Sequence, residues 1–356
     1  MAKELGFGLL GAGLVAPFHA RSLRDSRGGR LVAICDSNQE RARKLASAYP
    51  APVYPDLDAM LGDPAVDVVN VLTPNHLHHA AVLACARAGK HVITEKPPAM
   101  SLAETDEMIQ ACAKAGVKFA CTVQCRVRAA VQAVKKALGQ KRFGRVLHAD
   151  AYMKFYRTEE YYHSDPWRSS RRSGAGVTVQ HAFHYIDLLL YLAGPIGTVE
   201  AKMTNLSHPS VQLEDTLIAL LTYSSGPQGV VQASTAMYPG TDIRVEINGT
   251  DGTAIVVGER IETWKFREER PGDEEVRRIG SASQATAATG PADFGHQDHQ
   301  VVIQDMIDAI STGGEPIIPV SSVRPTVEAV LAMYQSAARG TRVALPVDDD
   351  PSIWEL

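Results

Sequence analysis

A short glycine loop near the start of the chain limits the folds open to it more than any other feature. Residues 6–10 form an apolar run, residues 15–23 have helical periodicity, and the loop GAGLVA lies between them. Gly11 permits a tight turn, Gly13 lets the backbone approach a pyrophosphate, and small Ala16 allows close packing of helix on strand. An ordinary glycine turn has the same letters, so the motif needs a second signal.

That second signal is Asp36, which ends the next apolar strand, residues 30–35. A carboxylate at this position would accept hydrogen bonds from an adenosine ribose and repel a 2′-phosphate. Strand, glycines, helix and acid are therefore in register for a dinucleotide, and NAD is the predicted cofactor. NADP stays open, because Ser37 and Asn38 could tolerate a phosphate.

Strand and helix patterns alternate through the first 123 residues, and repeated βα units of this length predict a doubly wound parallel sheet. We therefore expect an NAD(P)-binding Rossmann domain over residues 1–123. Strands are expected at residues 6–10, 30–35, 53–54, 67–72, 91–94 and 118–123, and helices at 15–23, 39–49, 57–61, 77–88 and 102–115.

Beyond residue 123 amphipathic strands follow one another without helices between them, which predicts an α+β domain over residues 124–356 with an open-faced, mostly antiparallel sheet. Residues 281–290 are small and polar and are expected to form a loop. Strands are expected at residues 145–156, 199–204, 216–223, 229–235, 244–249, 253–257 and 260–266, and helices at 129–138, 177–193, 297–311 and 324–339.

The charge pattern excludes some partners. The net charge is only −4 and charges of both signs are interleaved, so neither a nucleic-acid nor a membrane surface is indicated. The five cysteines are scattered without a CxxC, which is typical of reduced thiols in a cytoplasmic enzyme. No secretory signal or membrane-spanning run is expected.

Two loops of unusual composition follow the fourth and fifth strands of the predicted Rossmann domain. Thr73-Pro74-Asn75, with His78, follows one strand, and Glu95-Lys96-Pro97 follows the other. The first loop could be a simple connection between strand and helix, in which Asn75 caps the next helix. In doubly wound sheets, however, ligands lie beyond the carboxyl ends of the strands, so charged residues there are expected to face the ligand.

With these motifs the sequence resembles the Gfo/Idh/MocA family, the glucose–fructose oxidoreductase and inositol dehydrogenase group. The resemblance extends to Gln124-Cys125-Arg126, to the segment QHAFHYID from Gln180 to Asp187, and to Leu213-Glu214-Asp215-Thr216. It implies a sugar, inositol or nucleotide-sugar dehydrogenase that forms homodimers or homotetramers through its C-terminal sheet. The sequence departs from the family at Cys125, Ala130, Ala175 and Gln180, which puts the substrate in doubt.

The resemblance also implies roles for individual residues. Lys96 is expected beside the nicotinamide ribose as the acid–base group, with His184 bonding the reacting hydroxyl and Asp187 fixing the substrate or His184. The expected cofactor-binding residues are Gly11, Ala12, Gly13, Leu14, Val15, Asp36, Ser37, Thr73, Pro74, Asn75, His78, Glu95, Lys96, Gln124 and Arg126. The expected substrate-binding residues are Lys96, Arg126, Tyr156, Arg157, Tyr161, Trp167, Arg168, Gln180, His181, His184 and Asp187.

Three other interpretations remain at this stage. The first is a glycoside hydrolase, because some relatives are hydrolases that oxidise C3 transiently and eliminate the aglycone. The second is a cofactor-binding sensor without turnover. Metal binding by the histidines of residues 76–79 or 296–299 is the last, but neither run has a matching ligand cluster, so no metal is predicted.

Overall fold

The computed structural model describes residues 4–281, 288, 290 and 295–355, and the chain divides into two compact units. The first comprises Met1–Gln124 and Gly295–Arg324, and the second Cys125–Phe294 and Pro325–Leu356. The first unit therefore includes a later return of the chain, which the division after residue 123 placed in the second domain. Most of the predicted loop 281–290 lies outside the described residues.

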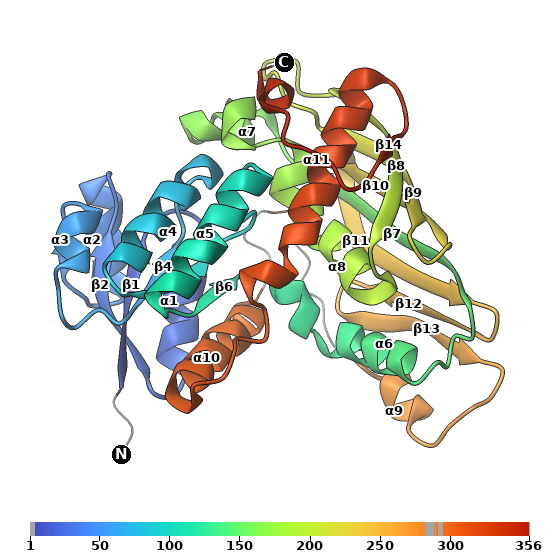
Figure 1. The fold of residues 1–356 in the computed structure, drawn as a ribbon, viewed down its shortest axis with the longest axis horizontal. Helices are drawn as coiled ribbons and strands as arrows, with labels where there is room; N and C mark the ends of the chain where they lie inside the picture. The colour runs from blue at the N-terminus through green and yellow to red at the C-terminus, as the bar shows by residue number, and fades with distance from the viewer. Residues whose placement is uncertain (1–3, 282–287, 289, 291–294, 356) are drawn as a thin grey trace. The chain divides into compact units, whose positions relative to one another are not determined.

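The first unit contains a six-stranded sheet in the order β3-β2-β1-β4-β5-β6, with every neighbouring pair parallel. This confirms the predicted doubly wound sheet (Figure 1). Its strands are β1 Leu5–Leu10, β2 Gly29–Cys35, β3 Val53–Tyr54, β4 Val68–Val71, β5 His91–Thr94 and β6 Phe119–Cys121. Its helices are α1 Ala16–Asp25, α2 Gln39–Ala48, α3 Leu57–Leu61, α4 His78–Arg87, α5 Leu102–Ala115 and α10 Gln297–Thr312, with 3-10 turns at Asn75–Leu77 and Val320–Ser322.

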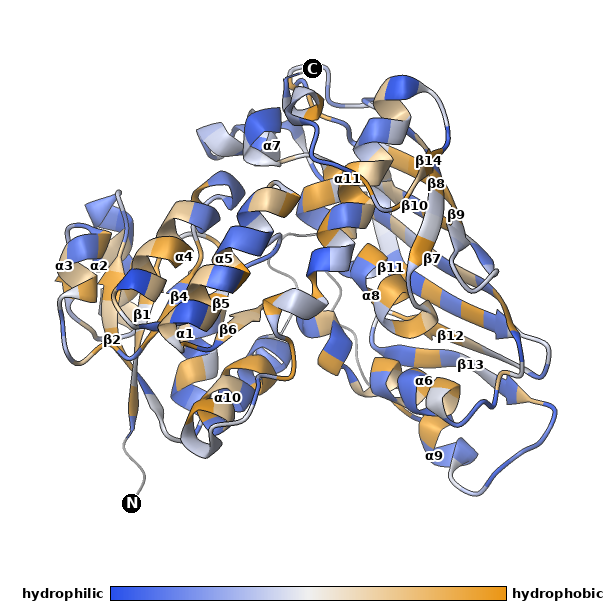
Figure 2. Cartoon of the chain, in the orientation of Figure 1, coloured by the Kyte–Doolittle hydropathy of each residue, from blue (hydrophilic) through white to orange (hydrophobic). Residues whose placement is uncertain are grey.

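The central strands of this sheet are buried on both faces, which is why they are continuous apolar runs. Figure 2 shows the contrast with α4 and α5, where hydrophobic and hydrophilic residues alternate. Helix α10 packs against α1 and contributes Ile303 and Met306 to the same core as Phe7, Leu9 and Leu23. The return of the chain is thus part of the first unit because it completes that core.

The second unit contains an eight-stranded sheet in the order β13-β12-β11-β7-β10-β9-β8-β14. Only β7 and β10 pair in parallel, so the predicted mostly antiparallel sheet is also confirmed. Its strands are β7 Val146–Tyr156, β8 Ile196–Thr204, β9 Thr216–Tyr223, β10 Gln228–Ser234, β11 Ala236–Gly249, β12 Gly252–Val257, β13 Arg260–Phe266 and β14 Val343–Ala344. Its helices are α6 Ala129–Gly139, α7 Glu159–His163, α8 Phe183–Ala193, α9 Asp273–Arg277 and α11 Arg324–Arg339, with short 3-10 turns at Gln124–Val127, Pro166–Ser169, Arg171–Ser173 and Pro351–Trp354.

Helices cover one face of this sheet. Helix α8 packs on β7 and β11, α6 packs on β12, and Ser336 of α11 accepts a hydrogen bond from the amide of Ala201 in β8. Along β9 every second residue is buried, whereas Ile218 and Leu220 are 47% and 54% exposed. The other face of the sheet is therefore open at β9 and partly apolar.

The segment predicted as one helix over residues 177–193 differs from that prediction. Thr178–Ala182 is a π-helical turn, and α8 follows it from Phe183. A buried carboxylate lies at its start: the backbone amide of Thr178 donates to Glu214 Oε1 at 3.1 Å. A Cβ on Gly176 would lie 2.1 Å from that oxygen, so the close approach requires glycine. Hydrophobic periodicity cannot separate one π turn from an α-helix, because both bury one side.

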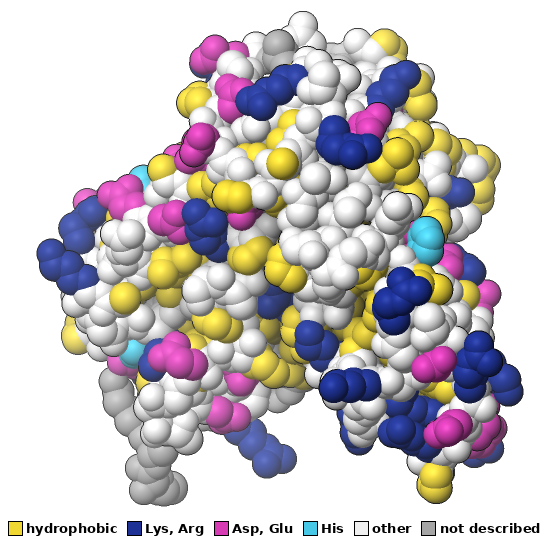
Figure 3. Space-filling model, turned by 45° about the vertical axis from the view of Figure 1, so that its right-hand side comes forward, with side chains coloured by type: hydrophobic (Ala, Val, Ile, Leu, Met, Phe, Trp, Pro, Cys, Tyr) yellow, Lys and Arg dark blue, Asp and Glu magenta, His cyan; other side chains and the backbone are white. Residues whose placement is uncertain are grey.

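Lys and Arg side chains are interspersed with Asp and Glu over the face drawn in Figure 3. Among the described residues, no helix has both the length and the apolar character that a membrane crossing requires.

Candidate active site

The glycine loop has the geometry that a dinucleotide requires. Gly11 has a φ of +106°, and a Cβ there would lie 2.7 Å from the Leu72 carbonyl oxygen. A Cβ on Gly13 would meet no atom within 4 Å, so this glycine leaves open space above the loop. Ala16 is fully buried, and α1 begins there without a side-chain cap on its first amides. The loop and helix start therefore form a cradle suited to an anionic group.

Asp36 lies beside this loop and is bonded to it. One carboxylate oxygen accepts a hydrogen bond from the Ala12 amide at 2.6 Å, and the other accepts from the Asn38 amide at 2.7 Å. Each oxygen has a further lone pair for a ribose hydroxyl. Ser37 is exposed, and the Asn38 side chain caps α2 by accepting from Glu40 and Arg41. These features fit NAD as the bound group.

The strand ends that carry the predicted cofactor residues are in register. Cys35 pairs with Leu10, Leu10 with Val71, and Val71 with Thr94, so four neighbouring strands end in one row. The glycine loop, Asp36, the Thr73-Pro74-Asn75 loop and Glu95-Lys96 each follow a strand of that row. The parallel sheet thus collects at one edge the predicted residues Gly11, Ala12, Gly13, Leu14, Val15, Asp36, Ser37, Thr73, Pro74, Asn75, His78, Glu95 and Lys96.

His78 ties two of these loops together. Its imidazole is fully buried, with Nδ1 2.8 Å from the Pro97 carbonyl oxygen and Nε2 2.9 Å from the Thr73 carbonyl oxygen. Burial lowers the pKa of His78, so the ring is neutral at neutral pH and donates to one carbonyl at a time. This bridge holds the loops after β4 and β5 against each other, and Lys96, itself only 8% exposed, lies in the second loop.

Sequence reasoning missed the groups that surround Glu95. His19 Nε2 lies 3.0 Å from Glu95 Oε1, Asn70 lies behind His19, and His299 Nε2 lies 3.9 Å from the same oxygen. One signal was available, because Asn70 is a polar residue within the otherwise apolar strand β4. Nothing in the sequence pattern connects His299 to this cluster.

In the second unit, two predicted site residues that lie 61 positions apart in the sequence, Arg126 and Asp187, are hydrogen-bonded to each other. The guanidinium of Arg126 donates to both oxygens of Asp187 at 2.6 Å, and Thr326 Oγ1 donates to Asp187 at 2.8 Å. Asp187 is fully buried, so these bonds hold its carboxylate within the unit. Its contacts are with Arg126 and Thr326, which makes it a residue that positions Arg126. His184 lies one turn earlier on α8 and is partly exposed.

Five predicted substrate residues form an aromatic–arginine cluster: Arg157, Tyr161, Trp167, Arg168 and His181. Arg168 donates to the Tyr161 hydroxyl at 2.9 Å, and its guanidinium lies 4.8 Å and 4.6 Å from the ring centres of Tyr161 and Trp167. The guanidinium of Arg157 lies 5.7 Å from the Tyr161 ring centre, and His181 Nε2 lies 3.4 Å from its hydroxyl. These distances are typical of cation–π contacts.

The remaining predicted substrate residues lie outside this cluster. Tyr156 packs edge-on against Tyr238, with ring centres 5.2 Å apart. Gln180 is half-buried on the π-helical turn. Gln124 belongs to the first unit and Arg126 to the second, although one short turn carries both.

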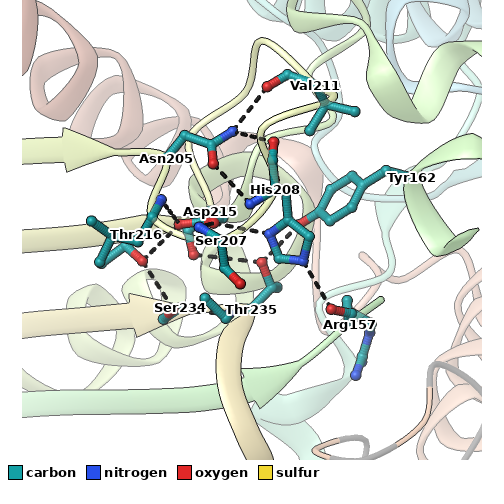
Figure 4. Close-up of polar contacts among 12 residues, drawn as sticks. Arg157, Tyr162, Asn205, Ser207, His208, Val211, Asp215, Thr216, Ser234 and Thr235 are labelled. Carbon is teal, nitrogen blue, oxygen red and sulfur yellow. Dashed lines mark hydrogen bonds and ion pairs between the residues drawn. The ribbon is translucent and has the colours of Figure 1, made fainter. Parts of the chain in front are cut away.

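A buried ion pair holds the backbone behind the aromatic–arginine cluster (Figure 4). Asp215 accepts from His208 Nδ1 at 2.9 Å and from the amides of Leu206 and Ser207, while His208 Nε2 donates to the Arg157 carbonyl at 2.9 Å. Both ring nitrogens face acceptors, as in His78, but one acceptor here is a carboxylate, which favours the imidazolium form. Tyr162 packs on the His208 ring, with centres 4.7 Å apart, and bonds Thr235.

The pKa values of this pair move in opposite directions. Burial disfavours both charges, but the His208 bonds to Asp215 and to the Arg157 carbonyl outweigh it and raise the pKa of His208. The bonds from His208, Leu206 and Ser207 likewise outweigh burial and lower the pKa of Asp215 to about 2. The His208 contribution to stability is therefore complete below its unfolded pKa of 6.5 and is lost as pH rises through the higher folded value.

We predict that His208→Gln destabilises the protein at about pH 6 by roughly 2 kcal/mol, or about 4–8 °C in thermal midpoint, because Asp215 loses its charged partner. The difference in stability from the unsubstituted protein should narrow at alkaline pH, because His208 loses its charge as the pH rises through its raised pKa. Thermal unfolding followed at about pH 6 and at an alkaline pH measures this. His163→Gln, at an exposed histidine, is the matched control. An equal gap at both pH values would contradict the charged-histidine assignment.

Comparisons with known proteins agree with this geometry. Residues 5–123 match the oxidoreductase family with an NAD-binding Rossmann fold, and residues 131–255 match the GFO/IDH/MocA C-terminal domain. The structure of the WlbA dehydrogenase from Bordetella pertussis, in complex with NADH and UDP-GlcNAcA, is similar with a TM-score of 0.87. It is 31% identical, and the match covers 97% of this chain and 99% of that one.

Curated relatives are similar over most of the chain. The D-apiose dehydrogenase of Paraburkholderia graminis is 28% identical over 96% of this chain and 90% of its own length. The 1,5-anhydro-D-fructose reductase of Ensifer adhaerens is 29% identical over 73% of this chain and 77% of its own length. The resemblance expected from the motifs is confirmed: the chain belongs to the Gfo/Idh/MocA family of NAD-binding oxidoreductases.

Proposed function

We propose that this enzyme transfers a hydride between NAD and a secondary hydroxyl or ketone of a sugar derivative. The observation that carries the proposal is the buried Lys96, which follows β5 on the same sheet edge as the glycine loop and Asp36. A buried ammonium at a dinucleotide-binding edge is costly to keep and suits a proton-transfer role. The relatives named above are dehydrogenases and a reductase of sugars, which favours this activity over a hydrolase or a sensor.

In the proposed reaction, different side chains of this chain have different roles. Bound NAD would supply the hydride acceptor. In oxidation the substrate carbon gives up the hydride, and the neutral amine of Lys96 takes the hydroxyl proton; in reduction the Lys96 ammonium returns that proton to the ketone oxygen. His184 orients the reacting hydroxyl. Asp187 acts indirectly, because it holds Arg126 through two hydrogen bonds.

We further propose that the substrate carries an anionic group, as a sugar acid or a nucleotide sugar does. The aromatic–arginine cluster supports this, because Tyr161 and Trp167 offer ring faces and Arg168 carries a guanidinium group of the kind that matches phosphate or carboxylate. The WlbA dehydrogenases of Bordetella pertussis and Chromobacterium violaceum were both crystallised with UDP-GlcNAcA, an anionic nucleotide sugar.

We place the enzyme in the cytoplasm as a homo-oligomer. All five cysteines are buried thiols, which suits a reducing compartment. For assembly we propose that the open sheet face pairs with a second copy, because the exposed Ile218 and Leu220 lie beside the half-buried Val230 of β10. An apolar patch on a regular sheet face is self-complementary under a two-fold axis.

A panel of candidate substrates tests the proposed activity. UDP-sugars, sugar acids, neutral sugars and inositol are offered with NAD, and reduced nicotinamide is followed by absorbance; turnover is expected with the anionic members. Lys96→Ala should lower kcat by about 10²–10⁴ and leave NADH binding nearly unchanged, the usual effect of losing a positioned acid–base group. Lys114→Ala, at an exposed position of α5, is the control.

Two results of this panel would contradict the proposal. Unchanged turnover in Lys96→Ala would remove that residue from the chemistry. Release of an aglycone without net formation of reduced cofactor would replace the dehydrogenase with the hydrolase interpretation.

Asp36→Asn tests the cofactor preference. The amide keeps an oxygen for the Ala12 amide but removes the charge that repels a 2′-phosphate. We expect the unsubstituted enzyme to prefer NAD, and the ratio of kcat/KM for NAD over NADP to fall by about tenfold, the effect of roughly 1.4 kcal/mol. Glu40→Gln, which removes an exposed negative charge nearby on α2, should leave the ratio unchanged. Equal ratios in all three proteins would refute the role of Asp36.

Leu220→Asp tests the assembly. A carboxylate in the centre of the proposed interface would be buried without a partner, which costs several kcal/mol per ion. We expect sedimentation velocity to show smaller particles than for the unsubstituted protein. Val301→Asp, at an exposed apolar position of α10 in the first unit, should leave the particle size unchanged. An unaltered assembly in Leu220→Asp would place the interface elsewhere.

A further inference from the structure

The Glu95 carboxylate is held by a chain of buried polar side chains. Asn70 Nδ2 lies 3.0 Å from His19 Nδ1, and His19 Nε2 lies 3.0 Å from Glu95 Oε1. Asn70 and His19 are 0% and 1% exposed, and Glu95 is 9% exposed. Because the Asn70 amide donates to Nδ1, the ring proton lies on Nε2 and points at the carboxylate.

Glu95 is charged despite its burial. The groups that face it are His19 from α1, His299 from α10, His78 from α4, and Lys96 next in the chain. Burial alone would raise the pKa of Glu95, but the hydrogen bond from His19 and the electrostatic influence of His19, His299 and Lys96 lower it to about 2. A buried carboxylate that stays ionised stabilises any cation beside it.

The cluster connects two functional segments of the first unit. His19 lies in the first turn of α1, the helix that begins directly after the glycine loop. Glu95 directly precedes Lys96, and the Lys96 amide donates to Glu95 Oε2 at 3.4 Å. The His19–Glu95 bond therefore fixes the peptide that carries Lys96 to the helix that follows the pyrophosphate loop.

We propose that Glu95 is a positioning residue for Lys96: held by His19 and Asn70, its carboxylate fixes the orientation of the lysine and favours its ammonium form. This rests on the proposed function, in which Lys96 exchanges a proton with the substrate. The proposal predicts the direction in which the pH dependence of kcat/KM shifts. In the oxidation direction kcat/KM rises with pH as the amine loses its proton, and Glu95 places that rise at higher pH than the lysine alone would.

Glu95→Gln tests the proposal, because the amide oxygen still accepts from His19 but has no charge. We expect the midpoint of the rise in kcat/KM with pH to move to lower pH by about one unit, because removal of a neighbouring negative charge makes the ammonium form less favourable. NADH affinity should change by less than about threefold, since the charge does not touch the glycine loop. His19→Gln, which loosens the carboxylate but leaves its charge, should lower kcat and leave the midpoint in place.

Glu107→Gln is the matched control. It removes the exposed carboxylate that bonds His79 at 2.8 Å, a glutamate–histidine pair on the surface of the same unit. Its pH profile should coincide with that of the unsubstituted enzyme. A loss of activity in Glu95→Gln without any shift of the midpoint would reduce Glu95 to a structural role and overturn the proposal.

A readout without turnover separates this proposal from the proposed function. The ¹³Cε chemical shift of Lys96, assigned with Lys96→Arg, reports its protonation directly and should titrate at lower pH in Glu95→Gln. That shift would support the inference even if no substrate were turned over; its absence would overturn it even in an active dehydrogenase.

Treatment with a chelator tests a competing identity for the cluster. The ligand-type atoms of His19, Glu95 and His299 lie within 4.8 Å of one another, as a divalent cation would need. Activity that is lost on dialysis against a chelator and restored by Zn²⁺ would make the cluster a metal site and overturn the proposal.

Discussion

Parallel pairing of β2, β1, β4 and β5 is the constraint on which the first unit's chemistry depends. Parallel strands share a direction, so their carboxyl ends meet at one edge, and here Cys35, Leu10, Val71 and Thr94 end in a single row. Apart from Gln124, which follows β6, each residue assigned to the cofactor in this unit lies in a loop or at a helix start that follows that row. Slippage of β5 by one residue would move the loop that carries Lys96 out of line with the other strand ends.

Buried carboxylates at three places in the chain follow one rule: each has a donor of its own. Glu95 accepts from His19, Asp187 from Arg126, and Asp215 from His208. An isolated buried charge costs far more than any one hydrogen bond returns, so the donor is a condition for the acid to be present at all. The first pair holds the loop of Lys96, the second holds the Gln124–Val127 turn to α8, and the third holds the backbone behind the aromatic–arginine cluster.

The sequence predicted what local signals encode. The glycine loop, Asp36 and the strand-end loops are contiguous motifs, and both sheets follow from the change from alternating strand and helix patterns to successive amphipathic strands. The His19–Glu95 and Arg126–Asp187 pairs join residues 76 and 61 positions apart, which no periodicity reveals. The packing of α10 in the first unit was also not predicted. An amphipathic pattern shows which side of a helix is buried but not which element covers that side.

The π-helical turn before α8 separates two sets of side chains that share one continuous segment. Each residue of an α-helix advances by about 100°, so the wider turn sets Gln180 and His181 at a different angle from His184 than an unbroken helix would. Loss of a single residue here would restore regular winding and rotate the upstream pair without disturbing the Arg126–Asp187 bond downstream. The winding of this one turn therefore sets the direction of Gln180 and His181 independently of the Arg126–Asp187 pair.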